Sequence, residues 1–300
     1  MATITEIQVE ADIEEPTEKK PLWVVLGKLI RRQPLGAAGA AIVIVMLFLS
    51  IFAEFITAHD PELNSFENML VAPGAPFYMG TDQFGRDVFT RIIYGARTAL
   101  FVGFTAAFFG AFIGLVLGVA SAYFGGRFDL LFQRVMDVFL AFPLIIMALA
   151  IVAIFGPGLE NVIIAITIPF IPQCARVVRS NALAIREIPY VDAARALGFG
   201  HARIILRHMV PNVMGPFLIM LSTFVGHAIL LEASLSYLGL GVQEPTPAWG
   251  LMLQGGAEEY AESAPWMAIW PGVAISLAVF GFNLFGDALR DVLDPRLRAR

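Results

Sequence analysis

The feature that most restricts the fold of this chain is a series of apolar stretches separated by polar segments. A helix needs about 20 mostly apolar residues to cross a bilayer. Only 15% of the 300 residues are charged, against about 25% in typical soluble domains. The sequence therefore predicts an all-α membrane protein with six transmembrane helices. The expected spans are 36–56, 99–123, an approach helix and then the third span within 128–155, a fourth span starting at 161 and reaching about 174, 213–238 and 266–285. Pro143 is expected to kink the entry to the third span.

The polar segments divide the chain into four parts. Residues 1–34 form an acidic tail and an interfacial helix, and residues 35–98 form the first transmembrane helix and an extracytoplasmic segment. Residues 99–290 form a core with five transmembrane helices, and residues 291–300 are a basic tail. The first twenty residues lack aromatic side chains and are rich in acids, which is typical of a disordered tail and unlike a signal peptide.

The positions of the cations predict how the chain crosses the membrane. With both termini in the cytoplasm, seventeen of the twenty Lys and Arg residues face the cytoplasm, and only Arg86, Arg91 and Arg97 face the other side. Cytoplasmic loops carry an excess of Lys and Arg, so this orientation is strongly favoured. It places the longest polar loop of the second half, residues 176–212, in the cytoplasm.

That loop, between the fourth and fifth spans, has a pattern of its own. It holds six arginines and two acids. Pro189 suits the first turn of a helix, Asp192 then lies near its positive end, and Gly198 can adopt the left-handed conformation that ends it. A second short helix is expected from about 201 to 209, with Pro211 ending it. We expect a helix, a glycine bend and a second helix. The small alanines of the first helix would allow another protein to approach it closely.

These residues carry a family resemblance. Asp192-Ala193-Ala194, then Gly198, then the run from His208 to Pro211 have the spacing of the EAA loop of binding-protein-dependent ABC importer permeases. Asp192 stands where that family has Glu, His208 where it has Ile and Val210 where it has Leu. The resemblance implies contact with an ATPase subunit. The alternative is a basic connector that lies on the lipid surface. The residues implied in ATPase coupling are Asp192, Ala193, Ala194, Gly198, His208 and Pro211.

A second motif resembles a narrower group. Gly80-Thr81-Asp82, two residues, and Gly85-Arg86-Asp87 are similar to a segment of the C-type permeases of the dipeptide, oligopeptide and nickel branch. Asp82 can accept hydrogen bonds from its own downstream backbone, Gly85 can turn the chain, and Asp87 can cap the next helix. We interpret the motif as a structural turn and helix cap rather than a substrate site.

Two further features concern the spans themselves. Gly110, Gly114 and Gly118 form a ladder on the second span that suits close helix packing, and we expect it to contact a second permease. Glu232 and His227 are the ionisable residues inside a span, so they are candidates for the translocation path, with Glu232 as a purely structural acid the alternative.

The resemblance implies a permease subunit of an ATP-driven ABC importer in the bacterial inner membrane, carrying small peptides or nickel chelates. Its expected partners are a homologous second permease, two ATPase subunits, an extracytoplasmic binding protein and membrane lipid, with no nucleic acid. ATP and Mg²⁺ would bind the ATPase subunits, because this chain has no P-loop. We expect no catalytic residues, no cofactor and no metal: the chain has one cysteine, and its four histidines are scattered. The alternatives are an ion-coupled secondary transporter and a membrane-embedded enzyme.

Overall fold

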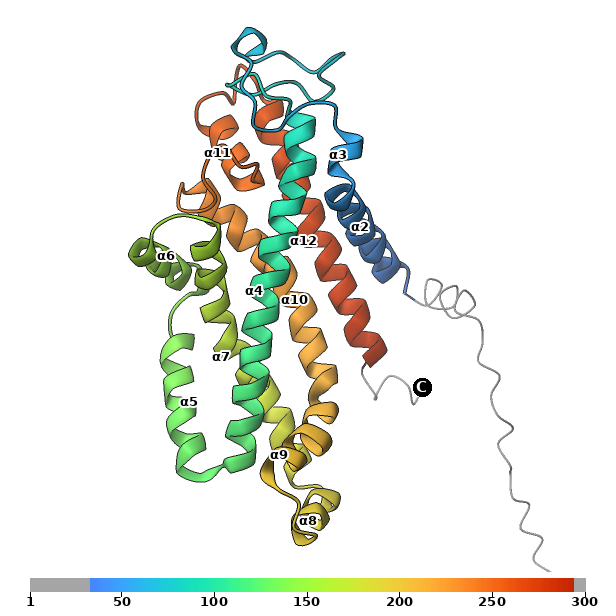
Figure 1. Cartoon of the computed structure of the whole chain (residues 1–300), viewed down its shortest axis with the longest axis vertical. Helices are drawn as coiled ribbons and strands as arrows, with labels where there is room; N and C mark the ends of the chain where they lie inside the picture. The colour runs from blue at the N-terminus through green and yellow to red at the C-terminus, as the bar shows by residue number, and fades with distance from the viewer. Residues whose placement is uncertain (1–32, 294–300) are drawn as a thin grey trace, which may run out of the picture.

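The computed structural model describes residues 33–293, which form a helical bundle (Figure 1). The expected acidic tail, the interfacial helix and most of the basic tail lie outside the described residues. The elements are α2 (Pro34–Ile51), α3 (Ala53–Ile56), η1 (Phe66–Asn68), α4 (Val88–Phe124), α5 (Gly126–Leu140), α6 (Leu144–Phe155), α7 (Leu159–Arg186), α8 (Pro189–Ala196), α9 (His201–Ile204), η2 (Ile205–Met209), α10 (Val210–Tyr237), α11 (Trp249–Glu258) and α12 (Trp266–Leu293).

Five helices of the described chain are long and apolar enough to cross a membrane: α2, α4, α7, the continuous run from α9 to α10, and α12. The expected approach helix and third span are present as α5 and α6, which meet at an angle of 88° on either side of Pro143, where the sequence predicts a kink. Near the start of α5, Arg186 Nη1 donates to the Ala122 carbonyl at 2.9 Å. At the start of α7, Gly158 N–H donates to the Gly241 carbonyl at 3.1 Å. The pair therefore carries the chain from one end of the bundle to the other by a bent path.

Several helices extend beyond the apolar stretches that predicted them. α4 begins at Val88 rather than 99, and at 37 residues it is about 55 Å long, well beyond the hydrocarbon core of a bilayer of about 30 Å. α7 continues to Arg186, so the first part of the expected loop 176–212 is helical. Hydropathy locates only the part of a helix in lipid, whereas the helix continues for as long as its neighbours support it.

The glycine ladder packs inside this chain rather than on an outer surface. A Cβ added to Gly114 would lie 2.6 Å from Cys174 Cβ, and one added to Gly118 would lie 2.6 Å from the Ala175 carbonyl oxygen. Gly110 likewise faces Phe170 of α7. The expectation that this ladder contacts a second permease was wrong, because Phe170, Cys174 and Ala175 of α7 cover the glycine face.

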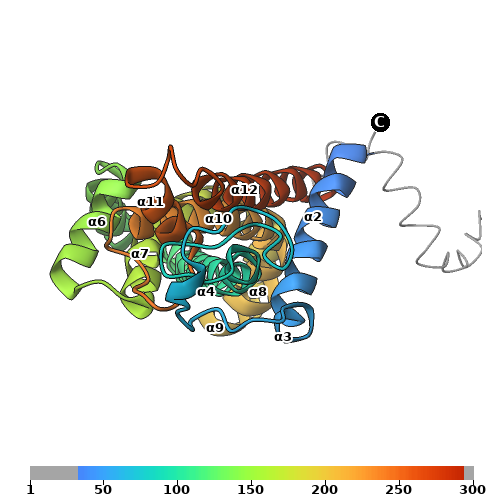
Figure 2. The ribbon, with the colours of Figure 1, turned by 90° about the horizontal axis from the view of Figure 1, so that it is seen from above.

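The two ends of the bundle carry different structures (Figure 1). α8 and α9 lie together at one end, which we call the α8 end. The segment before α4, with α11, lies at the opposite end, which we call the α11 end. α11 packs against α10 and α12, and was not predicted because ten residues are too few for a span. Seen from above, α2 lies at the edge beside α12, and α4 and α10 lie near the centre (Figure 2).

Candidate functional sites

The bend after α8 has the geometry that its sequence predicts. Gly198 has a φ of +77°, in the left-handed region. Its N–H donates to the Arg195 carbonyl at 2.9 Å, and the Phe199 N–H donates to the Ala194 carbonyl at 3.1 Å. These two bonds form a Schellman motif, which ends α8 and redirects the chain. The predicted helix from 189 to 197 is confirmed to within one residue.

α8 presents a largely uncovered side at the end of the bundle. Val191 and Ala194 are buried against the rest of the chain, whereas Asp192, Ala193 and Leu197 are exposed. Arg195 Nη1 donates to Asp192 Oδ1 at 3.0 Å, so the acid lies in the first turn and pairs within the helix. The outward side is therefore thin and short, and it carries one acid whose charge is partly balanced.

The expectation that Pro211 ends the second helix was wrong. The chain after Gly200 continues without interruption through α9, the π-helical turn η2 and α10. In that turn the Val210 N–H donates to the carbonyl of Ile205, five residues back. Pro211 then lies in the first turn of α10, where its missing N–H costs only one bond. The wide turn thus passes the proline and joins α9 directly to α10.

A clamp of polar side chains joins α8 to that turn. We name Tyr190, His208 and Asn212 the joint clamp. Tyr190 Oη donates to the His208 carbonyl at 3.1 Å. Asn212 Nδ2 donates to the same carbonyl at 2.7 Å and lies 3.1 Å from Tyr190 Oη. The His208 ring stacks on Phe199, just beyond the Gly198 bend. His208 is therefore brought next to α8, but Tyr190 and Asn212 were missed as its contacts because they lie 18 residues before it and 4 residues after it.

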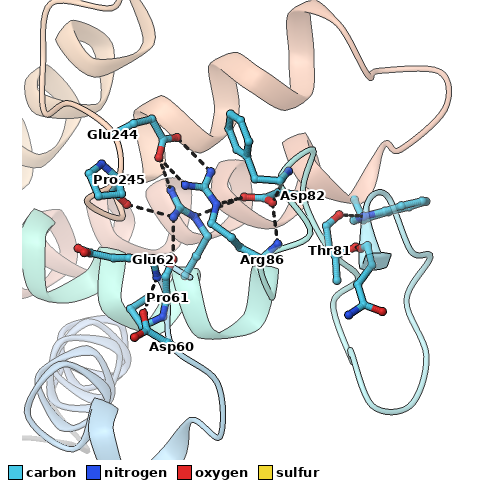
Figure 3. A network of polar contacts seen from close by, with 12 residues as sticks. Asp60, Pro61, Glu62, Thr81, Asp82, Arg86, Glu244 and Pro245 are labelled. Atoms are coloured by element: carbon cyan, nitrogen blue, oxygen red, sulfur yellow. Dashed lines mark hydrogen bonds and ion pairs between the residues drawn. The ribbon is translucent and has the colours of Figure 1, made fainter. Parts of the chain in front are cut away.

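The second motif forms a compact turn at the α11 end (Figure 3). Asp82 Oδ1 accepts hydrogen bonds from the backbone N–H groups of Phe84 and Arg86, each at 2.9 Å. Gly85 has a φ of +73°, and Asp87 Oδ2 accepts from the Thr90 N–H at 3.0 Å at the start of α4. The turn and the helix cap predicted from the sequence are both present.

The same motif supplies half of a charged cluster, which we define as Asp82, Arg86, Arg91 and Glu244. The first three side chains are buried, whereas that of Glu244 is 39% exposed. Arg86 Nε donates to Asp82 Oδ2 at 2.7 Å, and its Nη1 donates to Glu244 Oε2 at 2.5 Å (Figure 3). Arg91 Nη1 donates to the carbonyls of Pro61 and Pro245, at 2.8 and 3.2 Å. The cluster ties the start of α4 to the segment between α10 and α11. No local pattern pointed to Glu244, which follows Arg86 by 158 residues.

The charged cluster controls the ionisation of Glu244. Burial by itself favours the neutral acid, but the hydrogen bond from Arg86 and the positive charges of Arg91 and Arg86 outweigh it and lower the pKa of Glu244. Two guanidinium groups face two carboxylates, so the cluster has no net charge while both acids are ionised. It therefore functions as a junction between segments rather than as an open binding site for an ion.

Glu232 and His227 lie on different sides of α10. Glu232 is 1% exposed, and Ser236 Oγ donates to its Oε1 at 2.7 Å. Ser236 Oγ also accepts the N–H of Val242 at 3.2 Å, so the acid supports the turn after α10. His227 is exposed on the surface of the single chain. The structure does not bring these two candidates together.

Comparison with known proteins identifies the family. The family model described as binding-protein-dependent transport system inner membrane component matches residues 110–299. The chain belongs to this permease family. The model of the N-terminal transmembrane domain of oligopeptide transport permease C matches residues 22–73. The permease is therefore a multi-pass inner-membrane subunit of a binding-protein-dependent ABC importer, and the comparisons do not support the ion-coupled alternative.

Relatives and solved structures agree with that assignment. The permease is 42% identical over 277 residues to the dipeptide transport system permease protein DppC of Alkalihalophilus pseudofirmus, covering 92% of this chain and 91% of the relative. It is 41% identical over 285 residues to the glutathione transport system permease protein GsiD of Shigella flexneri, covering 95% and 94%. An inward-facing structure of the MetNI methionine ABC transporter has a TM-score of 0.55 at 20% identity, covering 69% of this chain and 97% of that one, which shows a shared fold.

Proposed function

We propose that this permease imports small peptides and that α8 is the helix through which ATPase subunits drive it. The observation that carries the second part is the outward side of α8, thin and uncovered, held at a fixed angle by the Schellman motif at Gly198. The names of two relatives, a dipeptide and a glutathione permease, support a peptide substrate. Nickel chelates are the competing substrate class.

The assembly follows from the distribution of charge. Arg179, Arg186 and Arg195 lie towards the α8 end, whereas Arg86, Arg91 and Arg97 lie at the α11 end. Seventeen of the twenty cations fall on the cytoplasmic side if the α8 end faces the cytoplasm. Two ATPase subunits would then dock under α8 and its counterpart in a second, homologous permease. A binding protein would deliver substrate at the α11 end.

The mechanism is alternating access, driven by the ATPase subunits at the α8 end. ATP closes the ATPase pair and displaces α8. The joint clamp and the continuous run from α9 to α10 then transmit that displacement to a spanning helix. The bundle swings as a fairly rigid body, as packed helices do in hinge and shear motions. The ATP and Mg²⁺ lie on the partner subunits, and this chain contributes no group to hydrolysis.

A matched pair of glycine variants tests the coupling role. Gly198 and Gly200 are both exposed, and a Cβ on either would meet no atom within 4 Å. Only Gly198 has a positive φ, whereas Gly200 is extended at −66° and +155°. Gly198→Val is therefore strained by at least about 1 kcal/mol and re-aims α8, while Gly200→Val is tolerated. We expect Gly198→Val to lose ATPase copurification, or to hydrolyse ATP without transport, with the second permease still bound.

The measurements are copurification of the ATPase subunits and substrate-stimulated ATP hydrolysis in proteoliposomes. Wild-type docking and coupling in Gly198→Val would reject the coupling helix and leave a connector on the lipid surface. ATP-driven uptake of a labelled dipeptide, with a nickel chelate as competitor, tests the substrate separately. Uptake of the nickel chelate without uptake of the dipeptide would make the chelate, rather than peptides, the substrate.

A further inference from the structure

The outward faces of this bundle differ in chemistry. Every exposed residue of α4 between 101 and 116 is apolar, and five of the six are phenylalanines, Phe108 and Phe112 among them. On α10, the exposed residues between 213 and 237 are His227 and Leu230. On α12, Ser276 and Asn283 are exposed as well. One side of the permease therefore suits lipid, and another carries polar groups within spanning helices.

The polar side chains of α10 and α12 lie far from the ends of these helices and close to one another. Asn283 Oδ1 would lie 3.2 Å from a Cβ added to Gly226, the neighbour of His227, so the two helices bring these side chains to the same level. His227 is ten residues from the end of α10, about 15 Å along the helix. Ser276 lies two turns from Asn283 on the same face of α12. Among residues 33–293, neither the His227 ring nor the Asn283 amide has a hydrogen-bond partner.

A hollow lies next to these groups, on the side of the α11 end. It has a volume of about 350 Å³ and is lined by residues of α10, α11 and α12, including Leu230, Ser234 and Tyr237. Leu230 is one helical turn from His227, so the hollow continues the same surface. None of its lining residues is charged.

We propose that this surface, which we call the α10–α12 wall, is one side of the solute path, closed by the second permease. Its members are His227, Leu230, Ser234, Tyr237, Ser276 and Asn283. Polar and ionisable groups at membrane depth are costly in lipid and normally face protein or a water-filled cavity. The wall has hydrogen-bonding groups and an apolar hollow but no fixed charge, which fits zwitterionic peptides with varied side chains. This inference rests on the proposed import of peptides. It excludes Glu232, which is buried behind the wall.

Cysteine labelling of the assembled importer tests the wall. Cys174 is the single cysteine and is buried, so Cys174→Ala gives a cysteine-free starting point. His227→Cys, Ser276→Cys and Asn283→Cys are then compared with Ile44→Cys and Phe108→Cys, two exposed apolar sites on α2 and α4. The probe is a hydrophilic methanethiosulfonate reagent applied to the complex in nanodiscs. We expect the three wall positions to react at least tenfold faster than the controls, with rates that change when vanadate traps the ATPases.

Reaction at the control rate in every nucleotide state would overturn the wall, even if dipeptide uptake remains ATP-driven. A dipeptide bound during transport should slow labelling at His227→Cys. Fast labelling that no peptide slows, but that a nickel chelate does slow, would keep the wall and reject peptides as the substrate. Assembly is checked by copurification of the second permease, so a misassembled variant is not scored as unreactive.

Discussion

At the scale of single residues, Arg86 is the cation of the charged cluster that donates hydrogen bonds to both of its acids. Its guanidinium pairs with Asp82 and Glu244 at once, and its side chain is only 3% exposed. Removing a buried charge leaves its partners unpaired, which is costlier than the pair is favourable. Arg97 is a useful contrast, because its side chain is 43% exposed, it donates to the Ser50 carbonyl at 3.1 Å, and its partner Glu54, at 3.4 Å, is 68% exposed.

Arg86→Gln should therefore lower the free energy of unfolding by about 3 kcal/mol. Arg97→Gln should lower it by less than about 1 kcal/mol, as exposed pairs usually do. The measurement is thermal or denaturant unfolding of the purified importer in detergent. Equal effects of the two substitutions would contradict a buried, mutually dependent cluster.

The link between Arg86 and Glu244 should also depend on pH. The pKa of Glu244 is lowered in the folded chain, so its stabilising contribution is complete above the ordinary pKa of a glutamate. It is lost as the pH falls through the lowered value. A double-mutant cycle with Arg86→Gln and Glu244→Gln should give a constant coupling energy between about pH 6 and 8 and a smaller one below about pH 4. A coupling energy that falls between pH 8 and 6 would show that another group is titrating.

Glu232 gives a prediction about function. Because its carboxylate accepts from Ser236 and is buried away from the α10–α12 wall, we expect its charge to have no part in transport. Glu232→Gln keeps an acceptor for Ser236, so uptake and ATPase coupling should stay within about twofold of wild type. Glu232→Leu removes that acceptor and should destabilise the turn after α10 by about 1–3 kcal/mol. Loss of uptake in Glu232→Gln with normal assembly would return Glu232 to the translocation path.

At the scale of elements, the joint between α8 and α10 combines a rigid bend with a π-helical turn. π-helical turns interrupt the ordinary helix pattern and often occur at functional sites. The His208 carbonyl lies in this turn and accepts from both Tyr190 and Asn212. The joint therefore has a specific connection through which movement of α8 reaches a spanning helix.

Tyr190→Phe keeps the ring and removes the hydroxyl that bonds His208 and Asn212, at a cost of about 1–2 kcal/mol. We expect the ATPase subunits to stay bound while the number of substrate molecules moved per ATP falls several-fold. Tyr78→Phe is the control, because Tyr78 is 74% exposed in the segment before α4, at the α11 end of the bundle. Unchanged coupling in Tyr190→Phe would mean that α8 moves α10 without the clamp.

At the scale of the whole molecule, α4 is the helix around which the bundle is assembled. It contacts α2, α7 and α10, and its glycine face lets α7 approach closely. Close backbone approach through small residues is a main source of attraction between helices in lipid. The consequence for assembly differs from what the ladder alone predicted: it holds this subunit together rather than joining two subunits.

Gly114→Leu should therefore destabilise the subunit itself. The side chain would meet Cys174 and the backbone of Ile171, so we expect poor expression and a destabilisation of at least about 3 kcal/mol. Gly215→Leu is the matched control on α10, since a Cβ there meets nothing within 4 Å. A stable Gly114→Leu subunit that loses only its partner permease would restore the earlier interpretation of the ladder.

The sequence by itself determined which segments can lie in lipid, the helical class of the fold and the local geometry of two motifs. Apolar length, helix caps and glycine turns act over a few residues, so Asp87, Gly85 and Gly198 could be interpreted from their neighbours. The family resemblance rested on the same local spacings.

Only the tertiary structure decided which surfaces meet. It paired the glycine ladder with α7, joined Arg86 to Glu244 and separated Glu232 from His227 on α10. It also folded α11 against α10 and α12. Each of these depends on contacts between residues far apart in the chain, and no local pattern specifies which of several compatible small or polar faces will be covered.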